Sequence, residues 1–305
     1  MTMDGPCPVP RARFHSGGNQ VRTAQFFVVT LSCVLLISSS AAALPIVGAS
    51  ANTIPAGTFM LDVWGIWQDY SVNYKATGDD PGWCGLESGR TVTSGSFVPR
   101  IYYGVTDRFT VRVSLPFEDR YGEDTEADGG GKSNTGLGDI IIDPKIQVYR
   151  GEEGFPRAAL LAGVRFPTGD TESVEPGLVP PISDGSTDYM LGVVGTHKIA
   201  STTMHVCASY WMNGAKKSGG DSPDLLVGLA SVEMELDEDW ALLWEYKGVF
   251  GTEHSEFTRT YICPGISWSG SNTTIGFSGL VSAVREGAGL DFDWAPYFRV
   301  YYRFF

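Results

Sequence analysis

Residues 109–117 read Phe-Thr-Val-Arg-Val-Ser-Leu-Pro-Phe, and this stretch decides the fold. Apolar side chains fall at every second position from Phe109 onward, and Thr110, Arg112 and Ser114 take the positions between them. A β-strand turns successive side chains to opposite faces, so this alternation indicates a strand with one apolar and one polar face. A helix repeats at about 3.6 residues and cannot produce it.

Strand-like segments of this kind recur along the chain, bounded by clusters of Gly, Pro, Asp, Asn or Ser. We count twelve, at 58–69, 92–104, 109–117, 138–150, 157–166, 187–198, 203–212, 224–236, 240–250, 257–268, 273–284 and 294–304. Their number is even, and short connections alternate with long ones such as 70–91 and 118–137. This asymmetry is typical of bacterial outer-membrane proteins. We therefore predict an all-β fold, a transmembrane antiparallel up-and-down β-barrel with about twelve strands and periplasmic termini.

The charges inside the strands indicate which face meets lipid. In the four segments with two or more charges, the charges share one parity; Glu245 and Lys247, for example, alternate with Trp244 and Tyr246. Lipid does not tolerate charge at mid-depth, so the charged parity should face the lumen. Arg150 is an exception at a strand end. The charged residues predicted to line the pore are Asp62, Arg100, Arg112, Asp139, Asp143, Lys145, Arg165, Asp188, Lys198, Glu233, Glu235, Glu245, Lys247, Arg259, Arg299 and Arg303.

This predicted lumen is close to electrically balanced, with 7 acidic and 9 basic residues. Confined charges need partners, so we expect an ion-pair network rather than a selectivity ring of one sign. Twelve strands give a diameter between a barrel filled by its side chains and an open porin. We therefore expect a narrow, partly occluded pore.

Residues 1–43 have the features of a cleaved secretory signal peptide. Arg11, Arg13 and Arg22 precede an apolar run at 24–37, and three alanines at 41–43 suit cleavage. The division predicted is therefore a signal peptide at 1–43 and a barrel at 44–305, exported to the outer membrane of a Gram-negative type cell. The full chain carries a net charge of -13, which argues against a nucleic-acid partner.

Two other classes of protein are alternatives to a channel. An outer-membrane hydrolase would use His197, His205 or His254, and His205 alternates with Cys207 and Ser209 along one strand. Side chains two apart on a strand lie about 7 Å apart and point in parallel, which suits a nucleophile and base poorly. A soluble secreted β-sandwich would account for the strands, but it gives no reason for the alternating connections. We expect no catalytic residue and no cofactor.

Neither the cysteines nor the acidic segment 118–137 indicates a metal site. Cys84, Cys207 and Cys263 are too widely spaced for a zinc motif and are predicted to be isolated thiols. Residues 124–129 imitate the opening of a calcium loop, yet Thr135 replaces the glutamate required at the twelfth position. A solvated external loop is the preferred interpretation, with weak divalent-cation binding left open.

Several motifs resemble those of a known family. The stretches 103–117, 136–140 with Lys145, 159–170 and 186–189 are similar to the strand and turn signatures of the outer-membrane porins grouped as the MetA-pathway phenol degradation family. The resemblance covers roughly residues 95–200 and implies passage of small molecules, including aromatic or apolar ones. The last strand, ending at Phe304 and Phe305, resembles an assembly signal. The expected partners are outer-membrane lipid and lipopolysaccharide, the barrel-assembly machinery through this C-terminal strand, and a small-molecule permeant.

Overall fold

The computed structural model describes residues 45–70, 72–75, 82–85, 90–124, 130–151, 155–172, 179, 181–217, 222–252, 257–286 and 290–304. The predicted signal peptide at 1–43 and the calcium-like residues 125–129 lie outside this part of the chain. Among the described residues, no helix is long and apolar enough to cross a membrane.

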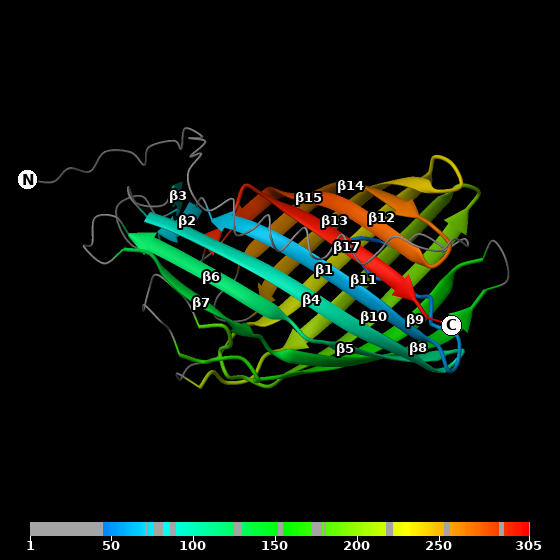
Figure 1. Ribbon diagram of the computed structural model, residues 1–305, viewed down its shortest axis with the longest axis horizontal. Helices are drawn as coiled ribbons and strands as arrows, with labels where there is room; N and C mark the ends of the chain where they lie inside the picture. The colour runs from blue at the N-terminus through cyan, green and yellow to red at the C-terminus, as the bar shows by residue number, and fades with distance from the viewer. Residues whose placement is uncertain are drawn as a thin grey trace, which may run out of the picture.

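The described chain forms β-strands that pair with antiparallel neighbours into a closed barrel (Figure 1). The strands are β1 (Phe59–Tyr70), β2 (Val72–Lys75), β3 (Gly82–Gly85), β4 (Arg90–Thr106), β5 (Phe109–Ser114), β6 (Phe117–Asp124), β7 (Lys132–Leu137), β8 (Ile140–Arg150), β9 (Arg157–Phe166), β10 (Asp188–Ile199), β11 (Thr202–Met212), β12 (Asp224–Glu235), β13 (Trp240–Thr252), β14 (Thr258–Ser269), β15 (Thr273–Glu286), β16 (Leu290–Asp291) and β17 (Trp294–Arg303). Closure comes from β1, which pairs with β17 on one side and with β4 on the other.

The barrel wall has twelve strand positions in the described chain, which confirms the predicted fold. β5 and β6 pair with successive parts of β4, so they form one long strand interrupted at Leu115 and Pro116. β7 pairs with β6 and leads into β8 in the same way. The prediction of a loop over 118–137 is therefore wrong for most of its length, because β6 and β7 extend the wall as a hairpin.

The two ends of the barrel differ in the length of their connections. Turns such as that between β4 and β5 and that between β10 and β11 are short. In the second of these turns Ala200 adopts a left-handed conformation, with φ of 52°. The connections at the other end are longer, and β2, β3 and β16 pair there as a small separate sheet. The start of β1 and the end of β17 both lie at the short-turn end, as the sequence predicts (Figure 1).

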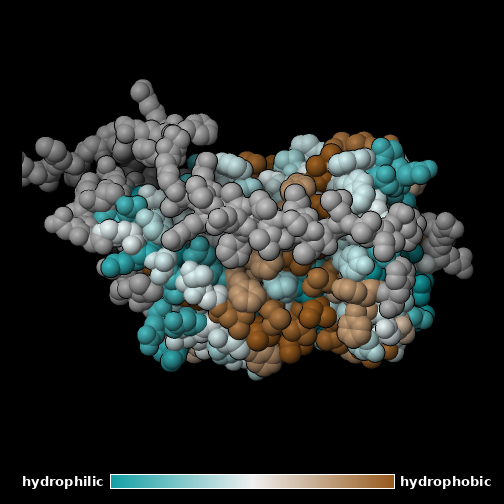
Figure 2. Space-filling view, in the orientation of Figure 1, coloured by the Kyte–Doolittle hydropathy of each residue, from teal (hydrophilic) through white to brown (hydrophobic). Residues whose placement is uncertain are grey.

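The outward face of the barrel is apolar. Leu191 and Val193 of β10 are 59% and 53% exposed, whereas Met190 and Val194 on the opposite face are buried. Figure 2 shows hydrophobic surface over the middle of the barrel and hydrophilic surface toward its ends. A water-soluble barrel would bury such side chains, so this surface is suited to the hydrocarbon core of a membrane.

Candidate functional site: the barrel interior

Residues 45–56, which precede β1, run through the inside of the barrel; we call them the inner segment. Their hydrogen bonds reach six strands spread around the wall, namely β5, β8, β9, β10, β13 and β17. A segment held from so many sides of a closed barrel can only lie in its lumen. No pattern in the sequence indicates this arrangement, so the inner segment is the main structural feature that was not predicted.

Charged side chains of the wall bind the backbone of the inner segment. The buried carboxylate of Glu245 on β13 accepts hydrogen bonds from the amides of Val47 and Gly48, at 2.8 and 2.9 Å. On β8, the Lys145 ammonium donates to the carbonyl oxygens of Ser50, at 3.0 Å, and Asn52. These two predicted pore residues are thus placed inside the barrel, and each is satisfied by a chain segment that fills the lumen.

The most buried ion pair of the interior joins Asp62 on β1 to Arg299 on β17. Asp62 is 0% exposed, and its two oxygens accept from Nε and Nη2 of Arg299 at 2.9 and 2.7 Å. Arg100 adds a third contact at 3.5 Å. The remaining nitrogen of Arg299 donates to the carbonyls of Pro45 and Ile46, both at 2.9 Å. This bidentate ion pair therefore also anchors the start of the inner segment.

Two further predicted pairs follow from the strand register. Arg112 lies directly opposite Asp143, and the Arg112 Nε donates to the carboxylate at 2.8 Å. Arg165 lies opposite Asp188 and forms an ion pair with it. The four charges lie on β5, β8, β9 and β10.

The other predicted pore residues occupy different depths. Lys247 shares the inward parity of Glu245, and Glu233 is 1% exposed with no hydrogen bond to Oε2 among the described residues. Asp139 accepts a hydrogen bond from the Gly169 amide at the break between β7 and β8, and Arg259 lies over the Phe257 ring. Arg303 is the last residue of β17. Lys198 forms an ion pair with Glu235 at the exposed rim of the short-turn end. These residues are not gathered into a single site.

One wall of the lumen is apolar, which the charge pattern did not predict. Trp64 stacks on Tyr297 with ring centroids 5.4 Å apart, and Tyr261 stacks on Phe292 at 5.2 Å. Ile46 of the inner segment packs into the same cluster. Trp64, Tyr261 and Tyr297 lie on the inward parity of β1, β14 and β17, so the sequence does contain this aromatic signal beside the charges.

The inner segment approaches the apolar wall so closely that only glycine fits beneath Ile46. A Cβ atom at Gly276 on β15 would lie 2.6 Å from the Ile46 Cγ1 atom. We therefore expect Gly276→Val to displace Ile46 and to increase the open time of the protein in planar bilayers. Gly279→Val on the same strand is the matched control, because a Cβ there meets nothing within 4 Å. Equal open times for the two variants would contradict the prediction.

At the long-loop end, the connection from β9 to β10 folds against the hairpin of β6 and β7. Arg120 donates to the carbonyl oxygens of Pro181 and Ile182, the second at 3.1 Å. Burial alone would raise the pKa of Asp184 in this connection, but hydrogen bonds from Ser186 and Ser222 outweigh it and hold the pKa below its ordinary value. Ordered chain therefore covers part of this end as well.

His205, the candidate base of the hydrolase alternative, holds the inner segment indirectly. Its Nδ1 lies 2.9 Å from Thr196 Oγ1, and that oxygen accepts from the Ala51 amide at 2.8 Å. Cys207 on the same strand is a buried free thiol, as is Cys263 on β14. The hydrogen bond of His205 to Thr196 thus gives this histidine a structural role in the lumen.

The sequence profile of a protein family matches much of the barrel. The family is described as "Putative MetA-pathway of phenol degradation", and the match spans residues 93–281. The chain belongs to this family. Membership confirms the resemblance seen in the sequence motifs and extends it from β4 to β15. No curated protein sequence matches the chain.

Comparison with solved structures finds one that shares the barrel fold of this MetA-pathway family member and others that superpose less well. A crystal structure of an outer membrane channel from Pseudomonas putida F1 superposes with a TM-score of 0.69 at 12% identity, covering 84% of this chain and 99% of the other. The translocator domain of the autotransporter NalP from Neisseria meningitidis gives 0.46 at 14% identity, covering 81% and 89%. The toluene transporter TbuX from Ralstonia pickettii gives 0.44 at 12% identity, covering 87% and 96%. At 12% identity the likeness to the Pseudomonas putida F1 channel concerns the fold.

Proposed function

We propose that the protein is an outer-membrane uptake channel for small apolar molecules, closed in this structure by the inner segment. The observation that carries the proposal is how the lumen is filled: the blocking chain is a single segment held by side chains of the wall. Removal of that segment would leave a continuous barrel, since every wall strand is paired with its neighbours independently of it. The structural relative from Pseudomonas putida F1 is itself described as an outer membrane channel.

The substrate class follows from the apolar wall. Trp64, Tyr261 and Tyr297 present aromatic surface to the interior, and Ile46 covers it while the inner segment is in place. An apolar permeant would gain the same contacts as Ile46, whereas a sugar would lose hydrogen bonds to water there. Two charged pairs lie on other strands of the wall: Arg112 with Asp143 on β5 and β8, and Arg165 with Asp188 on β9 and β10.

The same proposal assigns the chain its place in the cell. The signal peptide at 1–43 would be removed on export, the apolar outer surface would contact outer-membrane lipid and lipopolysaccharide, and β17 would engage the assembly machinery. No nucleic acid, cofactor or catalytic group enters this function.

Uptake by intact cells tests the proposal, because lipopolysaccharide slows the passive entry of apolar molecules. Cells carrying the protein should accumulate radiolabelled toluene or phenol faster than cells without it, and Gly276→Val should increase this rate several-fold. Purified protein in liposomes should admit sugars poorly. Rapid sugar-driven swelling comparable to that of a general porin, with no gain in aromatic uptake, would refute the proposed selectivity.

A further inference from the structure

Two arginines stand opposite one another at the short-turn end of the barrel. Arg150 ends β8, Arg157 begins β9, and the strand register pairs the two directly. Like charges in directly opposite positions destabilise a sheet. Among the described residues, neither guanidinium forms an ion pair with a carboxylate, so the pair lacks a counter-charge there.

A β-bulge brings both arginines to the inner side of the wall. The register of β8 and β9 shifts between Gln147 and Tyr149, and this extra residue reverses the parity of the positions after it. Arg150, the exception in the sequence pattern, therefore faces the lumen together with Arg157. The irregular strand thus concentrates positive charge at one point of the periplasmic mouth.

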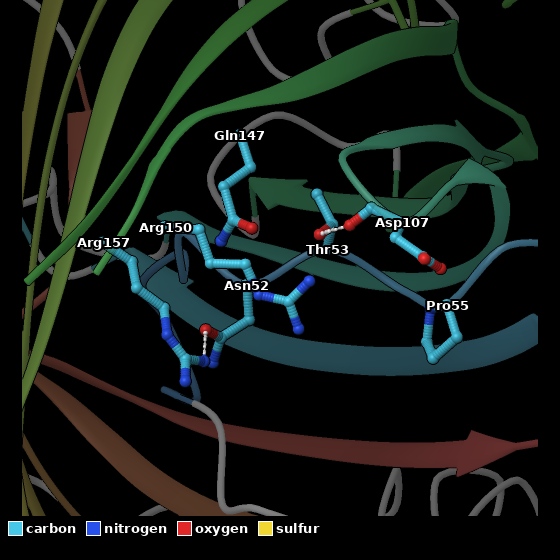
Figure 3. Close-up of a pocket in the computed structure, with 7 residues that line it drawn as sticks. All are labelled: Asn52, Thr53, Pro55, Asp107, Gln147, Arg150 and Arg157. Atoms are coloured by element: carbon cyan, nitrogen blue, oxygen red, sulfur yellow. Dashed lines mark hydrogen bonds between the residues drawn. The ribbon is translucent and has the colours of Figure 1, made fainter. Parts of the chain in front are cut away.

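The arginines line a pocket of about 220 Å³, whose opposite wall is the inner segment (Figure 3). Asn52, Thr53 and Pro55 supply that wall, and Asn52 Oδ1 accepts from Arg157 Nη1 at 2.7 Å. In Figure 3 the guanidinium groups lie on either side of the Asn52 side chain, and Asp107 lies toward the far end of the pocket. Asp107 Oδ1 accepts from the Ala56 amide at 3.0 Å, and among the described residues its carboxylate forms no ion pair with either arginine.

We propose that this pocket binds a phosphate group within reach of both Arg150 and Arg157, next to the Asn52 side chain that lies between them. Guanidinium forks match the oxygens of a phosphate and bond to it in pairs, and a dianion would balance both charges. Free phosphate, a phosphomonoester or a lipid headgroup would each supply this chemistry. Because the inner segment forms one wall of the site, the ligand binds the closed barrel better and favours it. This last consequence rests on the proposed channel function; the site itself does not.

Calorimetric titration of the full chain in detergent with inorganic phosphate tests the site. Native protein should bind phosphate, and Arg150→Gln should weaken binding about tenfold or more, as expected for loss of charge-assisted hydrogen bonds. Arg108→Gln is the matched control, since it removes one positive charge from the same end without lining the pocket. Its affinity should stay within about twofold of native. Absence of binding to native protein, or equal loss in both variants, would overturn the proposal.

The turn between the arginines contains Glu152 and Glu153, which lie outside the described residues. A double variant, Glu152→Gln with Glu153→Gln, shows whether they act as the counter-charge. Phosphate binding that arises only in this variant would overturn the proposal. If native protein binds inorganic phosphate more weakly in phosphatidylglycerol nanodiscs than in detergent, the site is supported and the lipid headgroup is its ligand. If the affinity for inorganic phosphate is the same in both, the site is supported and free phosphate is its ligand. Phosphate binding without any conductance would uphold the site and reject the channel.

Discussion

Oxidation of a Ser50→Cys/Thr196→Cys variant is expected to hold the barrel closed, with a fall of at least about tenfold in its open time. The two hydroxyl oxygens lie 3.4 Å apart, one on the inner segment and one on β10, and this proximity suits a disulfide between cysteines at the same positions. The native Cys84, Cys207 and Cys263 are first replaced by serine or alanine. Planar-bilayer recording before and after addition of a reductant measures the change.

The single variants provide the control for this experiment. Neither Ser50→Cys nor Thr196→Cys can form the bond alone, so their open times should not respond to oxidation. If the disulfide forms, as a gel shift or mass measurement would show, and the oxidised protein conducts as well as the reduced one, then the inner segment does not control the lumen.

Asp62→Ala is expected to destabilise the barrel by about 3–5 kcal/mol, because it leaves Arg299 as an unpaired charge. Arg299 is 4% exposed, so water cannot replace the lost carboxylate. A second variant, Asp62→Ala with Arg299→Met, should recover part of this loss, and the double-mutant cycle isolates the pair. Urea unfolding in lipid, followed by tryptophan fluorescence and by gel mobility, measures the free energy of unfolding.

The rim pair of Lys198 and Glu235 is the matched comparison for the buried pair. Their side chains are 55% and 39% exposed, so Glu235→Ala should cost no more than about 1 kcal/mol. An Asp62→Ala cost as small as that of Glu235→Ala would show that the interior around Asp62 is open to water. In that case the inner segment would not seal it.

The wall of the barrel was predictable because its pattern is local. Alternation at residues 109–117 and the shared parity of Glu245 and Lys247 reflect the period of a strand, whatever lies beside it. The hairpin of β6 and β7 was not predicted, because prediction depends on this local alternation and the hairpin lacks it. Most of its residues other than Phe117, Tyr121 and Leu137 are polar, and a strand that extends beyond lipid lacks the alternation that reveals the others.

The occupation of the lumen was not predictable from local pattern. The Val47 amide donates a hydrogen bond to Glu245, which is 198 residues away in the sequence. Residues 45–56 have no periodicity that would predict such contacts. The β-bulge after Gln147 likewise has no signature in the sequence, so Arg150 was an exception to the rule that the charges of one strand share a parity. The aromatic residues on the inward parity, including Trp64 and Tyr297, are visible in the sequence, but the charge pattern alone does not reveal them.

Thiol labelling of two alanines in one short segment tests the central claim most directly. In a background without other cysteines, Ala51→Cys and Ala56→Cys are each treated with a membrane-impermeant maleimide in bilayers open to reagent on both sides. Ala51 is 0% exposed because it packs against wall residues such as Val194, and Ala56 of the same segment is exposed at the short-turn mouth. We expect rapid labelling at position 56 and labelling at least about tenfold slower at position 51. Equal rates at the two positions would mean that residues 45–56 do not lie inside the barrel.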